Sequence, residues 1–244
     1  MPSTQQRVIK HAGFSGFATI RPALWFVTAD IDAVRNPARF IPPTFILIAL
    51  SSCATTNISQ INKHPPEIKH SRIMTLCIIS SDNLTAFDED FYDRNVRYSF
   101  NNFEDLKYRV QLEKTIRRNI ENENGFPNVI KSSEVFQATE DYTYEEFMQK
   151  FNETGCQALL LVNLKDRWNT TKYVTTYYEN SSITREDSEP NHLYYCYLID
   201  QKDLSRTNWV AIVEVQGVFA GFDTLNNHLA RKISRNLHKN NYIW

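Results

Sequence analysis

Ile-Met-Thr-Leu-Cys-Ile-Ile at residues 73–79 and Ala-Leu-Leu-Leu-Val at residues 158–162 are two nearly continuous apolar stretches of strand length. Turn-forming residues bound them, since Ser80 follows the first stretch and Gly155 precedes the second. Strands that are apolar on both sides must be covered on both faces, which is typical of parallel strands joined by helices. The two stretches therefore predict an α/β fold with two central strands.

Two helices and a further strand are expected between these central strands. Apolar residues recur at roughly helical spacing over residues 103–120, and the Asn-Gly pair at 124–125 marks a stop. Thr143 and Glu146 form a capping-box pattern at the start of the second helix, because the side chain of each residue can accept a hydrogen bond from the backbone N–H of the other. Residues 129–136 predict the strand that separates the two helices.

The C-terminal half has a different pattern. Residues 173–178, 192–199 and 209–218 mix aromatic, β-branched and polar side chains, as half-exposed strands do. The polar segment 179–191 makes the first two of these strands a long hairpin, and apolar residues at helical spacing over 225–237 predict a final helix. The expected order is β-α-β-α-β-β-β-β-α, in a mixed sheet within a single α/β (α+β) domain at residues 72–244.

The N-terminal segment has the features of a bacterial signal peptide. An apolar run at residues 40–50 is too short to span a membrane, and Arg35 and Arg39 precede it. Leu50, Ser51, Ser52 and Cys53 follow in an order that resembles the lipobox of bacterial lipoproteins, in which the cysteine receives a lipid and the chain is cut before it. The alternative is a buried strand over residues 45–50.

The domain boundaries follow from this interpretation. Residues 1–52 are the expected signal peptide, whose true start lies near residue 34 because the basic region is otherwise unusually long. Residues 53–71 are polar and rich in Thr, Ser, Asn and Pro, and they predict a lipidated flexible tether. In enterobacterial lipoproteins Asp after the cysteine retains the protein in the inner membrane. Ala54 stands there instead, so the resemblance implies the outer membrane.

The predicted order of elements also resembles a known group of outer-membrane lipoproteins. Residues 153–155 before the second apolar stretch, the aromatic hairpin and Trp209 on the last strand carry the likeness, over about residues 72–243. The group includes the curli-secretion lipoprotein CsgG and the lipoprotein activators of penicillin-binding proteins, and it shares a domain similar to the N-terminal domain of TolB. The resemblance implies this fold and transfers no functional residue.

Composition and motifs exclude several functions. The formal net charge is -1, so there is no electrostatic signature of nucleic-acid binding. The chain has only 6 Gly and lacks both glycine-rich phosphate-binding motifs, which excludes nucleotide binding through either motif. We expect no cofactor. Neither the histidines nor the acidic residues 88–93 have the spacing of a metal site. No catalytic nucleophile stands out, and we expect a protein that is not an enzyme.

The remaining cysteines, Cys77, Cys156 and Cys196, lie in or beside predicted strands. We expect three buried thiols, although an oxidising compartment would also allow one disulfide.

Tyrosines crowd the predicted hairpin and form the candidate binding surface. Alternation places Tyr173 and Tyr177 on one face, with Tyr195 and Tyr197 together on a face opposite or beside them. They either pack across the strands or form an aromatic surface for a protein or a glycan. The function that we expect is a lipid-anchored interaction or assembly module that binds another envelope protein. The alternatives are an enzyme that acts on envelope glycans or peptides and a subunit of a secretion pore.

Overall fold

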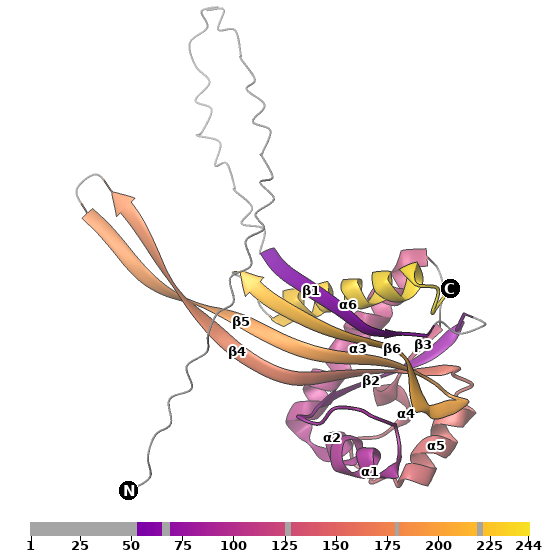
Figure 1. Ribbon diagram of the computed structural model, residues 1–244. Helices are drawn as coiled ribbons and strands as arrows, with labels where there is room; N and C mark the ends of the chain where they lie inside the picture. The colour runs from indigo at the N-terminus through magenta and orange to yellow at the C-terminus, as the bar shows by residue number, and fades with distance from the viewer. Residues whose placement is uncertain (1–52, 65–68, 125–127, 179–180, 219–221) are drawn as a thin grey trace, which may run out of the picture. The chain divides into compact units, whose positions relative to one another are not determined.

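Six strands form one mixed sheet in the part of the chain that the computed structural model describes, residues 53–64, 69–124, 128–178, 181–218 and 222–244. The order across the sheet is β1-β6-β5-β4-β2-β3 (Figure 1). The strands are β1 (Cys53–Lys63), β2 (Arg72–Ile79), β3 (Asn128–Lys131), β4 (Ala158–Tyr178), β5 (Ser181–Asp200) and β6 (Asp203–Val218). All described residues belong to one unit of the chain, Ala49–Trp244. The predicted signal peptide, 1–52, lies outside the described residues.

The two apolar stretches lie side by side at the centre of the sheet, as predicted. β2 pairs in parallel with β4, with Ile73 opposite Ala158 and Ile79 opposite Leu164. β3 is parallel to β2, whereas β5, β6 and β1 are each antiparallel to their neighbour in the sheet. The prediction of an α/β fold with a mixed sheet is therefore confirmed.

Helices cover this centre on both faces. On one face, α3 (Phe103–Asn124) and α6 (Phe222–Lys239) pack on a core that includes Cys77, Val162 and Trp209. On the other face, the aromatic core includes Tyr92, Phe136 and Phe147. The elements around it are α1 (Glu89–Phe91), the π-helix η1 (Tyr92–Val96), α2 (Arg97–Asn101), α4 (Ser132–Val135) and α5 (Tyr144–Glu153). No helix among the described residues is long and apolar enough to cross a membrane.

Local signals place the ends of α5 where the sequence predicts them. The Thr143 side chain accepts a hydrogen bond from the backbone N–H of Glu146, and the Glu146 side chain accepts one from the N–H of Thr143. Gly155 has a φ of +66°, a left-handed conformation that glycine adopts without strain. These signals depend only on neighbouring residues, which is why the sequence predicts them.

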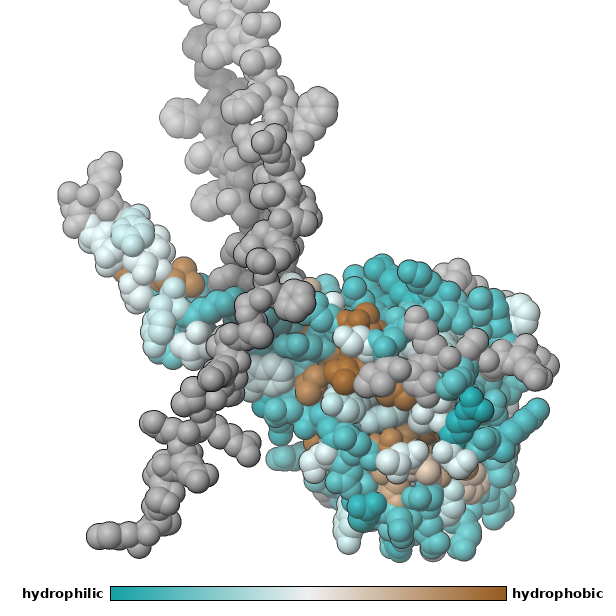
Figure 2. Space-filling model, viewed as in Figure 1, coloured by the Kyte–Doolittle hydropathy of each residue, from teal (hydrophilic) through white to brown (hydrophobic). Residues whose placement is uncertain are grey.

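The helices on this second face do not cover the whole sheet. In β6, Trp209, Ala211 and Val213 are buried under α6, whereas Val210 and Ile212 between them are only half-buried. Figure 2 shows apolar surface on this side of the molecule. This strand therefore has the half-exposed alternation that the sequence predicts.

The order of elements differs from the prediction at the hairpin. The predicted strands 158–162 and 173–178 are one strand, β4, and the segment predicted as a polar linker, 179–191, belongs largely to β5. Residues 165–172 are polar except for Trp168 and are mostly exposed, so they carry no apolar period. Periodicity reports burial, and an exposed strand does not show it.

The N-terminal end differs as well, because Cys53–Lys63 form the edge strand β1 where the sequence predicts a flexible tether over 53–71. β1 pairs with β6 from Cys53 opposite Val218 to Lys63 opposite Trp209. Among the described side chains of β1, the apolar Ala54 and Ile58 pack against the core, while Thr55 and Asn57 are exposed. Backbone pairing with β6 supplies the order that the side chains of β1 do not encode.

Candidate functional site

The end of the sheet that carries Cys53 is also the end from which a long hairpin leaves it. Cys53 is opposite Val218 of β6. Gln216, two residues before Val218, is opposite Asn191 of β5. Asn191 is in turn opposite Trp168 of β4. Beyond this row β4 and β5 pair only with each other (Figure 1). The predicted lipid attachment site and the root of the hairpin therefore lie at the same end of the sheet.

We call the two-stranded part of this hairpin the arm, residues 169–178 and 181–190. Its ten residue pairs run from Asn169 opposite Pro190 to Tyr178 opposite Ser181. At about 3.3 Å per residue, the arm reaches about 30 Å beyond the sheet. It is therefore the largest part of the described fold without a helix against it, as Figure 1 shows.

The two sides of the arm differ in charge. Directly paired residues share a side, so one side carries Tyr173, Thr175 and Tyr177 with their partners Glu186, Thr184 and Ser182. We call this the tyrosine side; Glu186 is the one charged residue among these six. The opposite side carries Lys172, Val174, Ile183, Arg185, Asp187 and Glu189.

Ion pairs organise the charged side. The Lys172 Nζ lies 2.5 Å from the Glu189 Oε2, and the Arg185 Nη2 lies 3.0 Å from the Asp187 Oδ2. Glu189 is buried at the root of the arm, whereas Lys172 and Arg185 are largely exposed. Both cations on this side are therefore matched by a carboxylate, and the side carries no net charge among these four groups.

The four predicted tyrosines do not form one surface. Tyr173 and Tyr177 are 72% and 81% exposed on the arm. Tyr197 is 3% exposed and packs in the aromatic core, where burial raises its pKa. Tyr195 is half-buried beneath the ammonium group of Lys165, which lies 5.1 Å from the ring centroid. The register separates the pairs, because Tyr195 is opposite Asn163, ten residues before Tyr173.

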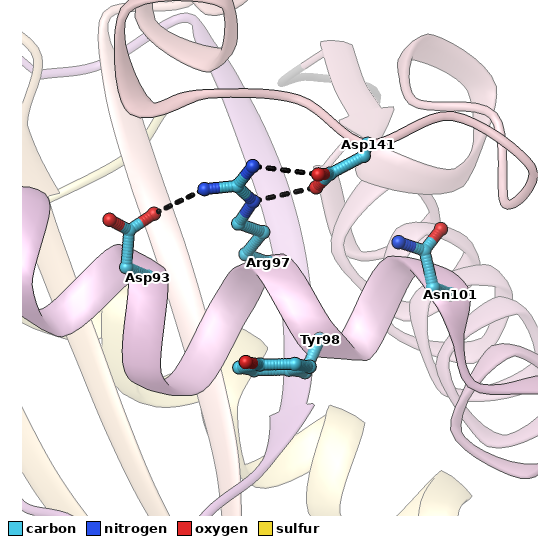
Figure 3. A pocket seen from close by; sticks show the side chains of 5 residues that line it. All are labelled: Asp93, Arg97, Tyr98, Asn101 and Asp141. Atoms are coloured by element: carbon cyan, nitrogen blue, oxygen red, sulfur yellow. Dashed lines mark hydrogen bonds and ion pairs between the residues drawn. The ribbon is translucent and has the colours of Figure 1, made fainter.

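A pocket that the sequence does not predict lies beside the π-helix η1. It measures about 440 Å³ and is lined by Asp93, Arg97, Tyr98, Asn101 and Asp141. The Arg97 guanidinium donates two hydrogen bonds of 2.6 Å to Asp141, and its Nη1 lies 3.3 Å from Asp93 (Figure 3). Tyr98 points away from this ion pair on the other side of α2.

The charged groups of this pocket form an ion pair that joins α2 to the loop before α5. The hydrogen bonds from Arg97 hold the pKa of the Asp141 carboxyl below its ordinary value, so Asp141 stays ionised. Asp93 and Arg97 are four residues apart on one helical face, a spacing visible in the sequence. Asp141 has no such signal, because it arrives from a loop 44 residues away.

The acidic residues 88–93 are dispersed in the structure. Asp88 accepts a hydrogen bond from the backbone N–H of Phe91 and caps α1, while Asp93 pairs with Arg97. No group of three His, Cys, Asp or Glu residues that could hold a metal ion occurs among the described residues.

The three remaining cysteines are free and buried, as predicted. Cys77 and Cys196 lie in one row across the sheet, with Val162 of β4 between them. Burial raises the pKa of all three thiols, so they are poor nucleophiles in the folded protein.

A buried polar pair on α3 has a structural role. The Glu113 carboxylate accepts hydrogen bonds from the Ser132 Oγ at 2.5 Å and from the backbone N–H of Ser133 at 3.0 Å, at the start of α4. Arg109, one turn earlier, lies 4.6 Å from the ring centroid of Phe100. The pair therefore connects α3 with α4 and α2 inside the protein.

Comparisons with known proteins give weak structural likenesses only. No family model matches the chain, and no curated protein matches it. Among solved structures, it is similar to the PelC dodecamer from Paraburkholderia phytofirmans, with a TM-score of 0.40 and 14% identity, over 78% of this chain and 100% of that one. It is also similar to the lipoprotein GNA1162 from Neisseria meningitidis, with a TM-score of 0.35 and 13% identity, over 69% of this chain and 99% of that one. At these values the likenesses carry no argument about the role of this chain.

Proposed function

We propose that the protein is a lipoprotein of the cell envelope, attached by lipid on Cys53, whose domain is an interaction or assembly module for another envelope protein. The observation that carries the proposal is the order Leu50, Ser51, Ser52 and Cys53 directly after a short apolar run with a basic flank. Two or more acyl chains on one residue hold a protein firmly at a membrane, whereas one chain is marginal.

The position of Cys53 in the fold supports this proposal. Cys53 pairs with Val218 at the end of the edge strand, so an enzyme that cuts before Cys53 leaves the pairs of β1 intact. The predicted attachment residue is therefore the end of the edge strand. The absence of Asp at position 54 extends the proposal to the outer membrane.

The competing proposal of an envelope enzyme has weaker support. The carboxylates that share a pocket, Asp93 and Asp141, both bind Arg97. A general acid needs a raised pKa, whereas the pKa of Asp141 is lowered. The pocket therefore fits a charge-paired structural contact better than an acid–base pair.

Metabolic labelling with a traceable fatty acid tests the anchor. We expect label on the full-length protein in bacterial membranes, loss of the label in Cys53→Ser, and retention of the label in the matched control Cys156→Ser. Separation of inner and outer membranes then locates the labelled protein. Label that persists in Cys53→Ser, or that never appears, would contradict the proposal.

Crosslinking in intact cells tests the module. We expect a defined envelope protein to be captured by the wild-type chain and lost from Cys53→Ser, because the anchor brings both to one membrane. Equal capture by both chains would show that the anchor is not needed for the interaction.

A further inference from the structure

We propose that the arm lies against the lipid surface that holds Cys53, with Tyr173 and Tyr177 in the headgroup layer; this inference rests on the proposed lipid anchor. It concerns the arm only, and the binding of an envelope protein by the rest of the domain is a separate matter.

No flexible segment separates Cys53 from the sheet. A flexible tether over 53–71 would lift the domain about 20–25 Å from the headgroups. Instead Cys53 itself is paired with β6, so a lipid on its sulfur is attached directly to the end of the sheet. The root of the arm lies at that end, two to three strands away from β1, which corresponds to about 10–15 Å.

The tyrosine side of the arm has the chemistry of a membrane interface. Tyrosine is enriched where hydrocarbon meets water, because its ring is apolar and its hydroxyl group remains hydrated. Tyr173 and Tyr177 are the most exposed aromatic residues among the described side chains of the arm, and hydroxyl side chains surround them. Glu186 is the one charge on this side, so contact with headgroups requires little loss of hydration from charged groups.

Charges and unpaired backbone groups limit how deeply the arm lies in the membrane. Lys172, Arg185, Asp187 and Glu189 occupy the opposite side, and both outer edges of the arm lack a strand partner among the described residues. Charges and unpaired backbone groups are costly in hydrocarbon, so the arm lies on the surface and does not enter the bilayer core. A two-stranded ribbon is marginally stable alone in water, and an adjacent surface would steady it.

Site-specific fluorescence tests the inference. The full-length lipidated protein with Tyr177→Cys is labelled with NBD, a fluorophore whose emission depends on its surroundings. The buried thiols of Cys77, Cys156 and Cys196 do not compete in the folded protein. The labelled protein is reconstituted into vesicles of phosphatidylethanolamine and phosphatidylglycerol that contain a phosphatidylcholine with a spin-labelled headgroup as quencher. We expect quenching at position 177 to be several-fold greater than at the controls.

Two matched controls use the same chemistry. Lys202→Cys places the label in the exposed turn between β5 and β6, at the opposite end of the sheet. Ile183→Cys places it on the charged side of the arm, one residue pair from Tyr177. All three positions are exposed, so none of the substitutions removes core packing, and circular dichroism confirms that each variant is folded.

The outcomes separate this inference from the proposed function. Strong quenching at 177 with little at 202 and less at 183 supports it. If mass spectrometry finds the acyl chains on Cys53 but position 177 is quenched no more than 202, only this inference is overturned. If Cys53 carries no lipid, both fail. If emission at 177 changes with protein concentration in micelles without quencher, the arm binds a second copy, which also overturns it.

Discussion

Replacement of His192 by asparagine should remove much of the pH dependence of folding at the root of the arm. His192 is 2% exposed on β5, opposite Arg167 of β4 and Val215 of β6. Its Nδ1 lies 3.0 Å from the hydroxyl of Tyr194. Burial, followed by the nearby Arg167 cation, lowers the pKa of His192 from 6.5 to about 4. The asparagine side chain in His192→Asn would keep a hydrogen-bond acceptor for Tyr194 and could not be protonated.

The sign follows from proton binding in the two states. Between pH 4 and pH 6.5 the unfolded chain binds a proton on this histidine that the folded chain does not. The contribution of His192 to stability is therefore complete above the unfolded pKa and is lost as the pH falls toward the folded pKa. At 1.36 kcal/mol per pKa unit the total is about 3.4 kcal/mol, and the change from pH 7 to pH 5 is about 2 kcal/mol.

Urea unfolding at pH 7 and pH 5 measures this quantity. The free energy of unfolding of the wild type should fall between the two pH values by about 2 kcal/mol more than that of His192→Asn. Tyr194→Phe keeps the histidine and should retain most of the wild-type pH dependence. An equal pH dependence in the wild type and His192→Asn would refute the reasoning.

Three further predictions concern the aromatic core, the edge strand β1 and the ion pair of Arg97. Tyr197→Ser should lower the free energy of unfolding by about 3–5 kcal/mol because it leaves a cavity in the aromatic core, whereas Tyr177→Ser should change it by less than about 0.5 kcal/mol, as measured by urea unfolding. Amide hydrogen exchange over Cys53–Lys63 should be slowed by pairing with β6. Exchange as fast as in an unfolded peptide would show that this segment is a flexible tether instead. Asp141→Asn should lower the urea midpoint at pH 7 but not at a pH below the lowered pKa of Asp141, because the contribution of its pair with Arg97 is lost as the pH falls through that pKa; an equal effect at both pH values would contradict this.

The sequence shows the candidate site only in part. It predicts tyrosines on the hairpin, and Tyr173 and Tyr177 are exposed there. The sequence does not show that they are separate from Tyr195 and Tyr197, because this depends on where β4 and β5 leave the sheet. It does not show the Arg97 pocket either, because Asp141 reaches Arg97 only through folding.

The sequence predicts the elements whose own side chains explain their structure, namely the two central strands and the capped helix α5 with its glycine stop. It also predicts the lipobox before Cys53. Three features appear only in the folded protein: β1 is a strand, β4 extends into the arm, and Cys53 lies at the same end of the sheet as the root of the arm. These two groups of elements are held in place by different interactions. A buried strand shows an apolar pattern, whereas an edge strand or an exposed ribbon is held by backbone hydrogen bonds to a partner strand, and every residue except proline can donate those bonds.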